Sequence, residues 1–472
     1  MGKIVGAQPL VIACAVTGQP DNEGAIFAAV LEHSIAPMAR GDYCDALRVR
    51  FSRRDSKWAS MLVRIGKDCL MKRNLHLAAA AFAALCPIFS SLASAQDATP
   101  AGRGGGRGGR GNVAPQPPSF EVRPDRTVVF RLAAPDAASV RLNGDFQQAP
   151  PAIGGAPPPS ASRDMTRGDD GVWTITVGPL HPAVYNYSFT VNGVRNIDPG
   201  NPMVKRGDRS SESMFEVPGD KPAVYDIQQV PHGTVHINWY HSVSLGAPRS
   251  IYVYTPPGYE KGKSKLPVLY LLHGSGDTEA GWVDIGRANL IIDNLVAAGA
   301  AKPMIVVMPY GRPLPEVMLV PSAGRGPVNA DDLFGNDLLQ DVIPYVEKLY
   351  RVSAKADDRA LAGLSMGGGQ ALRIGLAHLD KFHYIGAFSA AARGNPEEAF
   401  KDFFADPAAA NRKLRLFYIA CGKEDGLFAG SQALNDAFEK HQIKHRFAPS
   451  EEGHVWRNWR DYLADFAPQL FR

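Results

Sequence analysis

The stretch LAGLSMGGGQAL, residues 361–372, places one serine among four glycines where an apolar run gives way to a helix-forming pattern. Its segment GLSMG matches GxSxG, a motif typical of a sharp turn from a buried strand into a helix, with a nucleophilic serine at the turn. Glycine is expected two positions on either side, because a side chain there would collide with the neighbouring strand or helix. The alternative is a glycine-rich turn whose serine only caps the helix. The strand-like and helix-like flanks favour a nucleophilic Ser365.

Strand-like and helix-like segments alternate through the C-terminal half of the chain. Apolar runs that end in a turn predict buried strands at residues 266–274, 303–311, 359–365, 384–390 and 414–422. An antiparallel pair is predicted before them, at residues 237–243 and 249–257. This alternation predicts an α/β domain over residues 231–472, with a mostly parallel sheet and helices on both faces.

One long helix is predicted between the second and third of these buried strands. Residues 337–352, DLLQDVIPYVEKLYRV, have helical spacing, and Asp337 lies three residues before Gln340, as in a capping box. Pro344 is expected to kink this helix or to lie in its first turn.

A serine hydroxyl becomes a good nucleophile only when a base takes its proton, and the base needs a carboxylate partner. In folds built around this serine turn, the acid and then the histidine follow the serine along the chain. The segment CGKEDGL, after the last predicted strand run, offers Glu424 and Asp425. We predict Asp425, which directly precedes the turn at Gly426, and expect Glu424 to be solvated.

Three histidines follow the acid, and we predict that His454 is the base. It lies between a strand-like segment, KHRFAPS, and a terminal helix pattern, VWRNWRDYLADF. His441 and His445 are rivals by chain order, but they flank QIK and are expected on the solvated surface. No HExxH motif accompanies their spacing, so neither a metal site nor a cofactor is expected.

Hydrolysis through an acyl-enzyme also needs two donors aimed at the developing oxyanion. The backbone N–H of Met366, next to the nucleophile, is one predicted donor. The other is expected from HGSGD, residues 273–277, which follows the first central strand. Ser275 N–H is the predicted donor and Gly276 the next choice; the alternative for HGSGD is an ordinary β-turn.

The pattern is all-β from residue 119 to about residue 230. Short alternating or apolar runs predict a small sandwich with strands at residues 127–132, 138–144, 172–177 and 184–193. The segments VVFRLAAPDAASVRLNGDF and GVWTITVGPLHPAVYNYSFTVNG resemble the immunoglobulin-like carbohydrate-binding module of glycogen-branching enzymes. The resemblance implies a small all-β immunoglobulin-like domain over residues 119–230.

The aromatic residues of this domain differ from those of the module that it resembles. That family usually has a sugar-stacking tryptophan shortly after the GDF turn, where this chain has Gln147, Gln148 and Ala149. Trp173 and Tyr185 are other candidate sugar platforms, but an aromatic residue on an alternating strand is more often a core residue.

A set of motifs in the C-terminal domain occurs together and in order: LLHGSGD, GW at residues 281–282, ANLIIDNL, KPMIVVMPYG, NDLLQDVIPYVE, GLSMGG, GKEDGL and GHVWRNWR. As a set they resemble carbohydrate esterase family 1, which holds feruloyl and acetylxylan esterases and is similar to enterochelin esterases and mycolyltransferases. The resemblance spans roughly residues 234–472. It implies an α/β-hydrolase fold, the triad Ser365, Asp425 and His454, and an acyl pocket bordered by Trp282 or Trp456.

The sequence of the N-terminal residues predicts a targeting signal and not a folded domain. A basic start at Met71, an apolar run and the small residues Ala93, Ser94 and Ala95 predict a signal peptide at residues 71–95, so that residues 1–70 are an upstream extension. The alternative is a genuine N-terminal domain with a membrane anchor. Residues 96–118 are rich in Gly, Pro and Arg and predict a flexible linker, with an RNA-binding RGG segment as the alternative.

Charge and cysteine content fit an exported protein without a polyanionic partner. Residues 1–95 hold 11 of the 51 basic and 7 of the 47 acidic residues, so 40 of each remain after the predicted cleavage. Such a neutral balance does not favour nucleic-acid binding. Cys421 is the one cysteine beyond the cleavage site, so no internal disulfide is expected, and it is predicted as a core residue at the end of a strand.

The resemblance implies a serine esterase that cleaves feruloyl or acetyl esters of xylan. The predicted signal peptide places it in the periplasm or outside the cell. Its expected partner is an acylated polysaccharide or oligosaccharide, with no nucleic acid and no stable membrane insertion. One alternative is a siderophore esterase of the enterochelin type. The other is a sugar-binding protein built on a hydrolase scaffold without activity. The sequence does not determine the oligomeric state.

Overall fold

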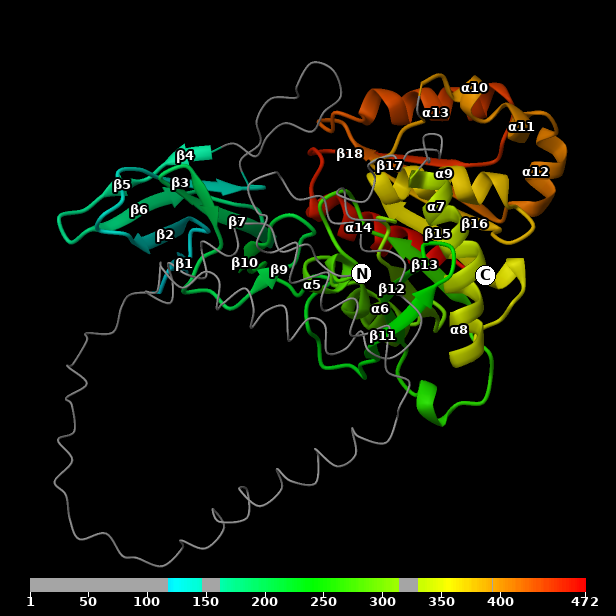
Figure 1. Cartoon of the computed structure of the whole chain (residues 1–472), viewed down its shortest axis with the longest axis horizontal. Helices are drawn as coiled ribbons and strands as arrows, with labels where there is room; N and C mark the ends of the chain where they lie inside the picture. Colours follow the sequence, from blue (N-terminus) through cyan, green and yellow to red (C-terminus); the bar gives the residue numbers. More distant parts are fainter. Residues whose placement is uncertain (1–117, 147–161, 314–329, 393) are drawn as a thin grey trace, which may run out of the picture. The chain divides into compact units, whose positions relative to one another are not determined.

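The computed structural model describes residues 118–146, 162–313, 330–392 and 394–472 (Figure 1). All of them belong to one compact unit, residues 110–472. The predicted upstream extension, the signal peptide and the linker up to residue 117 lie outside the described residues. Among the described helices, none is long and apolar enough to cross a membrane.

The first domain is a sandwich of two antiparallel sheets. One sheet has the order β1 (Phe120–Val122), β2 (Val128–Ala133), β6 (Val172–Val177) and β5 (Thr166–Arg167). The other has the order β4 (Ser162–Asp164), β3 (Val140–Gly144), β7 (Ala183–Val191), β10 (Glu212–Val217) and β9 (Val204–Lys205), and β8 (Val194–Asn196) pairs with β7. This is the predicted all-β sandwich. The strands β1, β4, β5, β8, β9 and β10 were not expected from the sequence.

Side chains from both sheets fill the sandwich with aromatic residues. Phe130, Tyr187 and Phe215 are fully buried and meet at ring-centroid distances of 4.8–5.6 Å. Trp173 and Tyr185 are 8% and 2% exposed, and belong to this core. They are therefore core residues and not sugar platforms.

The second domain is built on one sheet of eight strands. Its order is β11 (Thr234–Ser242), β12 (Ala247–Thr255), β14 (Ile305–Pro309), β13 (Val268–Leu272), β15 (Arg359–Leu364), β16 (Tyr384–Phe388), β17 (Leu416–Gly422) and β18 (Arg446–Ser450). β12 runs antiparallel to its two neighbours, and all other pairs are parallel. The strands predicted from apolar runs are therefore present, and the sheet is mostly parallel, as predicted.

Helices cover both faces of this sheet, because its strands are apolar on both sides. Along β13, Leu269 and Leu271 pack in one core cluster, while Val268, Tyr270 and Leu272 pack in another. The first face is covered by α5 (Gly281–Asp284), α6 (Ala288–Ala297) and α14 (Trp456–Phe466). The opposite face is covered by α7 (Ala330–Asn336), the π-helical turn η4 (Asp337–Val342), α8 (Ile343–Leu349), α9 (Met366–Ala377), α11 (Lys401–Phe404), α12 (Pro407–Lys413) and α13 (Phe428–Lys440).

Short elements complete the domain, and one predicted core residue lies within the sheet. The short elements are η2 (Tyr259–Lys261), η5 (Ala356–Asp358), α10 (Pro396–Ala399) and η6 (Ala467–Gln469). Cys421 of β17 is fully buried, as predicted for a core residue. Burial raises the pKa of its thiol to about 12, so at neutral pH the side chain is the unreactive thiol form.

The long helix begins earlier than its sequence pattern indicated. Asp337 does not cap the helix, because α7 begins at Ala330 and the helical run continues through η4 into α8. The Asp337 side chain is buried and accepts a hydrogen bond of 2.8 Å from the hydroxyl of Tyr240 on β11. Pro344 lies in the first turn of α8, directly after the π-helical turn η4 and well inside the helical run.

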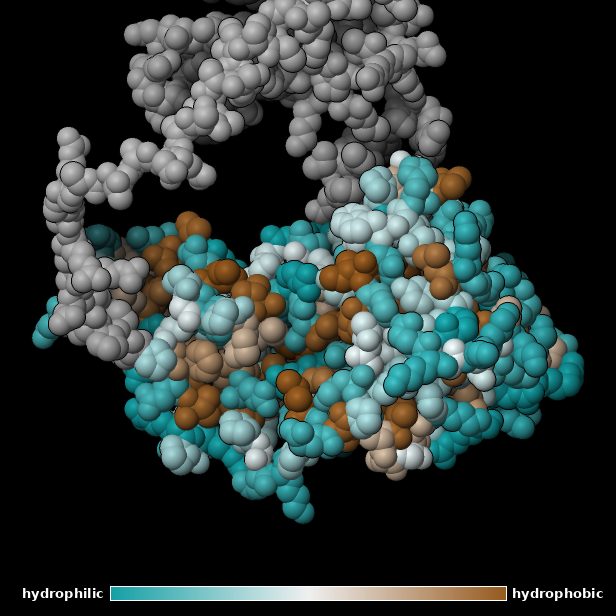
Figure 2. Space-filling view, turned by 90° about the horizontal axis from the view of Figure 1, so that it is seen from below, coloured by the Kyte–Doolittle hydropathy of each residue, from teal (hydrophilic) through white to brown (hydrophobic). Residues whose placement is uncertain are grey.

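The surface of the described residues is mixed in polarity. Figure 2 shows hydrophobic residues in several separate groups among hydrophilic ones on one face. The most exposed large apolar side chains include Trp239 of the edge strand β11, at 68%, and Val243 just beyond it, at 78%.

Candidate active site

The side chains predicted to act together all follow the carboxyl ends of adjacent parallel strands. His273 follows β13, Ser365 follows β15, Asp425 follows β17 and His454 follows β18. The strands β13, β15, β16, β17 and β18 are neighbours and parallel, so these ends lie along one edge of the sheet. Ligand sites of open α/β sheets form at this edge.

Ser365 lies at a strained turn between β15 and α9. Its φ of 52° and ψ of −114° are unusual for a residue with a side chain. Two backbone hydrogen bonds hold the turn: Ser365 N–H donates to Phe388 O at 2.8 Å, and Gly369 N–H donates to Ser365 O at 3.0 Å. The GxSxG segment therefore forms the sharp strand-to-helix turn that the sequence predicts.

The glycines on either side of Ser365 allow this turn by close approach of backbone atoms. A Cβ on Gly363 would lie 2.6 Å from the carbonyl of Gly367, and a Cβ on Gly367 would lie 2.6 Å from the carbonyl of His273. No real Cβ fits at such distances, so both positions require glycine. The turn thereby comes into contact with the end of β13.

Ser365, His454 and Asp425 form a hydrogen-bonded chain. The Ser365 Oγ lies 2.9 Å from His454 Nε2, and His454 Nδ1 lies 2.8 Å from Asp425 Oδ2. The side chain of Asp425 is 1% exposed and that of His454 is 14% exposed. With neutral His454, Nδ1–H donates to the carboxylate and Nε2 accepts the serine proton, which is the arrangement that general-base catalysis requires.

The carboxylate of Asp425 stays ionised in spite of its burial. Burial alone would raise the pKa of Asp425, but the hydrogen bond and charge of His454 and the N–H of Leu427 outweigh it and hold the pKa below its usual value. The Leu427 N–H donates to Asp425 Oδ1 at 2.9 Å. Asp425 is thus charged at neutral pH and can hold the His454 tautomer.

Sequence reasoning missed a second set of contacts around the acid and the base. Trp459 packs edge-on to the ring of His454 at a centroid distance of 4.9 Å, and its indole N–H donates to Ser389 Oγ at 2.9 Å. Ser389 is fully buried, and its hydroxyl helps to lower the pKa of Asp425. One signal was available, since Ser389 lies at the carboxyl end of a predicted parallel strand.

The rival residues lie elsewhere. His441 Nε2 lies 2.6 Å from Glu397, and His445 Nε2 lies 3.1 Å from Asn435. Both imidazoles are partly buried instead of solvated, because His441 stacks on Phe404 at 4.2 Å and His445 packs beside Phe438 at 5.7 Å. Glu424 is exposed, as expected. Within the described residues, no group of three His, Cys, Asp or Glu side chains is placed to hold a metal ion.

The HGSGD segment forms a β-turn beside the serine. Asp277 N–H donates to Gly274 O at 3.3 Å, and Gly276 has a φ of 88°, as in the third position of a type II turn. His273 Nδ1–H also donates to Gly274 O, at 2.8 Å, while His273 Nε2 accepts from Gly311 N–H at 2.8 Å. A Cβ on Gly274 would lie 3.4 Å from the Cβ of Ser365, so the turn is next to the nucleophile.

Two backbone N–H groups near Ser365 are free to meet a substrate. Among the hydrogen bonds of the described residues, none uses the Ser275 N–H as a donor. Met366 is the first residue of α9, and the first N–H groups of a helix have no acceptor within the helix. The predicted role of these two groups in an oxyanion hole stays a prediction.

Trp282 and Trp456, one of which was predicted to border an acyl pocket, are both buried in the structure. They are 0% and 3% exposed, and their rings pack at right angles with a centroid distance of 5.2 Å. The indole N–H of Trp282 donates to Leu272 O at 3.0 Å. Both rings fill the core under the sheet and leave no face for a substrate. Trp459 and Phe466 of the same helix stripe are also core residues.

Family comparisons agree with this architecture. Residues 242–470 match the family described as putative esterase, and residues 119–205 match carbohydrate-binding module 48, described as the isoamylase N-terminal domain. The C-terminal domain thus matches the putative esterase family over nearly its whole length. The resemblance of both domains, seen in the sequence motifs, is thereby confirmed, and we refer to them as the esterase domain and the module.

Individual relatives cover different parts of the chain. An endo-1,4-β-xylanase/feruloyl esterase of Xylanibacter ruminicola is 33% identical over 352 residues, which are 73% of this chain and 44% of that protein. The chain thus spans less than half the length of this curated relative. An acetyl esterase of Caldicellulosiruptor saccharolyticus is 24% identical, over 42% of this chain and 81% of that protein.

Solved structures show the fold. The enterobactin esterase of Shigella flexneri superposes with a TM-score of 0.54 at 19% identity, over 73% of this chain and 92% of that one. A CE1 ferulic acid esterase of Anaeromyces mucronatus has a TM-score of 0.46 at 25% identity, over 53% of this chain and 96% of that one. The predicted α/β-hydrolase fold of the esterase domain is confirmed.

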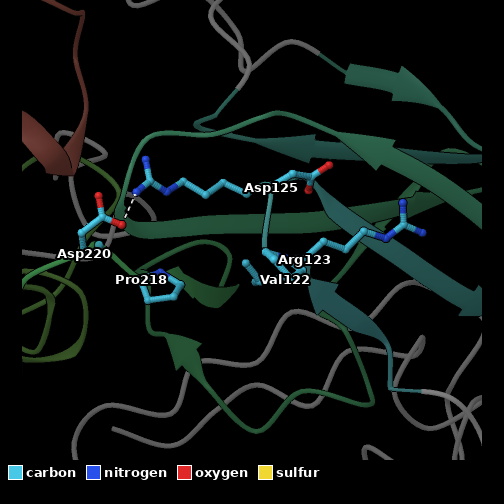
Figure 3. A pocket seen from close by; sticks show the side chains of 8 residues that line it. Val122, Arg123, Asp125, Pro218 and Asp220 are labelled. Carbon is cyan, nitrogen blue, oxygen red and sulfur yellow. Dashed lines mark hydrogen bonds and ion pairs between the residues drawn. The ribbon is translucent and has the colours of Figure 1, made fainter.

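A cavity at the edge of the module is lined mainly by charged residues and prolines. It measures about 370 Å³ and is lined by Val122, Arg123, Pro124, Asp125, Arg126, Pro218, Gly219 and Asp220. The ion pair between Arg126 and Asp220, 2.8 Å long, is the dashed line of Figure 3. None of the eight lining residues is aromatic, so this cavity lacks a ring on which a sugar could stack.

Proposed function

We propose that this protein is a serine carboxylic ester hydrolase. The observation that carries the proposal is the hydrogen-bonded chain from Ser365 through His454 to the buried Asp425, at 2.9 and 2.8 Å. A serine that only caps a helix needs neither a histidine partner nor a strained backbone at the turn. The match of residues 242–470 to the putative esterase family supports the same reaction.

The proposed reaction has two steps. Ser365 Oγ attacks the ester carbonyl while His454 Nε2 takes its proton, and the N–H groups of Met366 and Ser275 stabilise the oxyanion. The histidine then gives the proton to the leaving alcohol, which breaks the ester bond and leaves an acyl group on Ser365. Water, activated by the same histidine, hydrolyses this acyl-enzyme and restores the serine hydroxyl. Asp425 holds the imidazole and balances its positive charge.

The proposed substrate is an acylated plant polysaccharide, most specifically a feruloyl or acetyl ester of xylan. The relative of highest identity among those described above is named endo-1,4-β-xylanase/feruloyl esterase, and another is named acetyl esterase. The match of residues 119–205 to a carbohydrate-binding module supports a saccharide partner. We also propose that the protein is exported, because of the signal-peptide pattern at residues 71–95.

The experiment compares Ser365→Ala with wild type on methyl ferulate, 4-nitrophenyl acetate and a catecholate ester. We expect wild type to hydrolyse the feruloyl or acetyl ester, and Ser365→Ala to lose at least about 10³-fold in kcat while its fold is kept. A fluorophosphonate probe should label wild type and not the variant. Ser264→Ala, in an exposed loop, is the matched control and should behave as wild type.

Two results would contradict the proposal. One is a folded wild-type protein that hydrolyses none of the three esters and does not react with the probe. The other is a Ser365→Ala variant that keeps the wild-type rate. Preference for the catecholate ester would retain the esterase reaction but replace the proposed substrate.

A further inference from the structure

The module reaches the turn beside the nucleophile through a buried ion pair. Lys205 is the last residue of β9, and its Nζ lies 2.6 Å from Asp277 Oδ1 of the HGSGD turn. A second carboxylate, Glu212 of β10, lies 3.3 Å from the same Nζ. The Lys205 and Asp277 side chains are 9% and 5% exposed. A residue of the module therefore neutralises the last residue of this turn.

Backbone contacts accompany the ion pair. Gly207 pairs with Asp277 as an isolated antiparallel bridge, and Asp208 N–H donates to Gly276 O at 3.1 Å. The Asp208 carboxylate in turn lies 2.7 Å from Arg312. A Cβ on Gly207 would lie 2.2 Å from Ser210 O and 2.8 Å from Gly276 O, so glycine is required both by the path of this segment and by its approach to the turn. The segment after β9 thus lies directly against the HGSGD turn.

The turn that this segment contacts is the one that presents the Ser275 N–H. Gly274 O accepts from Asp277 N–H and from His273 Nδ1–H. The C=O and N–H of one peptide unit point in opposite directions, so fixing Gly274 O also fixes the direction of the Ser275 N–H. Any shift of Asp277 would change this geometry, and an oxyanion donor misplaced by a fraction of an ångström loses much of its effect.

Removal of the ammonium would leave Asp277 as a buried carboxylate without its partner. Such a group moves toward solvent or takes up a proton, since an isolated buried charge is strongly disfavoured. We propose that Lys205 is a positioning residue for ester hydrolysis, which holds Asp277 and, through it, the Ser275 N–H. This inference rests on the proposed function and adds that the module forms part of the catalytic machinery.

A second contact connects the module with the segment that carries the base. Arg457, three residues after His454, stacks on the ring of Tyr185 of β7 at 4.7 Å. The same guanidinium forms a 2.8 Å ion pair with Glu452. The module therefore contacts the segments on both sides of Ser365, the HGSGD turn and the His454 segment. This arrangement fits a supporting role for the module in addition to any binding of sugar.

The inference predicts an effect on esters that carry no sugar. Lys205→Met removes the charge and keeps the apolar stem. Gly207→Ala keeps every charge but displaces the segment, because its Cβ would clash with Ser210 O and Gly276 O. We expect each variant to lower kcat on methyl ferulate or 4-nitrophenyl acetate by at least tenfold, with KM within about threefold of wild type. The Ki of an aryl boronic acid, whose tetrahedral adduct needs the oxyanion donors, should rise by about the same factor as kcat falls.

A matched control separates positioning from loss of stability. Phe130→Leu, in the fully buried core of the module, should lower the unfolding temperature without changing kcat. All rates are measured below the unfolding temperature of each variant. If Lys205→Met does not fold, Gly207→Ala decides the question, because it removes no ion pair.

Several outcomes would overturn the inference. A folded Lys205→Met or Gly207→Ala variant with kcat within twofold of wild type would do so. A rise in KM alone would also do so, since it would indicate substrate binding by Lys205 instead of positioning. A wild-type protein without activity on the small esters would instead contradict the proposed function, so the two failures are distinguishable.

Discussion

At the scale of a single residue, burial and hydrogen bonds set the protonation state of His273, which lies beside the nucleophile. It is 1% exposed, and burial lowers the pKa of its imidazole. Its Nδ1–H donates to Gly274 O, and its Nε2 accepts from Gly311 N–H. The bond from Gly311 N–H requires the neutral imidazole, since an imidazolium would bring a second donor against that N–H. His273 therefore links the HGSGD turn to Gly311 only while it is neutral.

This residue should make the protein less stable in acid. A histidine of the unfolded chain titrates at about 6.5 and takes up a proton there, while the native His273 stays neutral to lower pH. Its stabilising contribution is thus complete above about pH 6.5 and is lost as the pH falls from there toward the native pKa, at roughly 1.4 kcal/mol per pH unit. Unfolding temperatures measured from pH 8 to 5 should fall less steeply for His273→Asn than for wild type. Parallel curves would contradict this account.

At the scale of elements, the turn from β15 to α9 contains several glycines. Either close approach of backbone atoms or backbone flexibility could explain why glycine occupies each position. A Cβ on Gly367 would lie 2.6 Å from the backbone carbonyl of His273, whereas the nearest atom to a Cβ on Gly369 is the flexible end of Arg373, at 3.3 Å. We expect Gly367→Ala to lose roughly 3 kcal/mol or more of unfolding free energy, or not to fold.

Gly369→Ala is the matched control on the same helix. It should stabilise the protein by about 0.5–1 kcal/mol, because alanine is the better helix former. Denaturant unfolding of both variants gives the comparison. Equal effects of the two substitutions would contradict close approach as the reason for Gly367.

At the scale of the whole molecule, one of the esterase domain's buried clusters extends into the module, which also has a core of its own. Val184 and Met214 of the module belong to the same buried cluster as Trp282 and Trp459 of the esterase domain. Arg460 of α14 is fully buried. Its guanidinium donates to the backbone carbonyl of Ile285 in the esterase domain and to that of Val184 in the module, at 2.9 Å each. Separation of the domains would expose this cluster to water and leave a buried guanidinium without one acceptor.

Residues 118–472 should therefore unfold in one cooperative transition. Calorimetry should give a single peak whose calorimetric and van 't Hoff enthalpies agree. A fragment of residues 231–472 should aggregate, or unfold at a clearly lower temperature than the longer chain. Two well-separated transitions, or a fragment as stable as the whole, would show that the module is an independent attachment.

The sequence by itself determined what depends on neighbouring residues. The strand positions followed from short apolar or alternating runs, because strand side chains point alternately to the two faces of a sheet. The Ser365 turn followed from GxSxG with its flanks, because the need for glycine at a sharp turn is a matter of local sterics. Asp425 and His454 were found from chain order and strand ends, although only the fold brings them to Ser365. The start of the long helix was misplaced, since Asp337 matched a local capping pattern while a tertiary contact with Tyr240 buries it.

Only the tertiary structure decided which side chains are buried and what each contacts across the sheet. Tryptophan is common in binding sites, yet Trp282 and Trp456 pack against each other and lie in the core. Lys205 has no local signal, because one lysine among 51 basic residues becomes distinctive only when folding places it beside Asp277, 72 positions later. Contacts between residues so far apart depend on the relative placement of whole elements, which no short segment of sequence specifies.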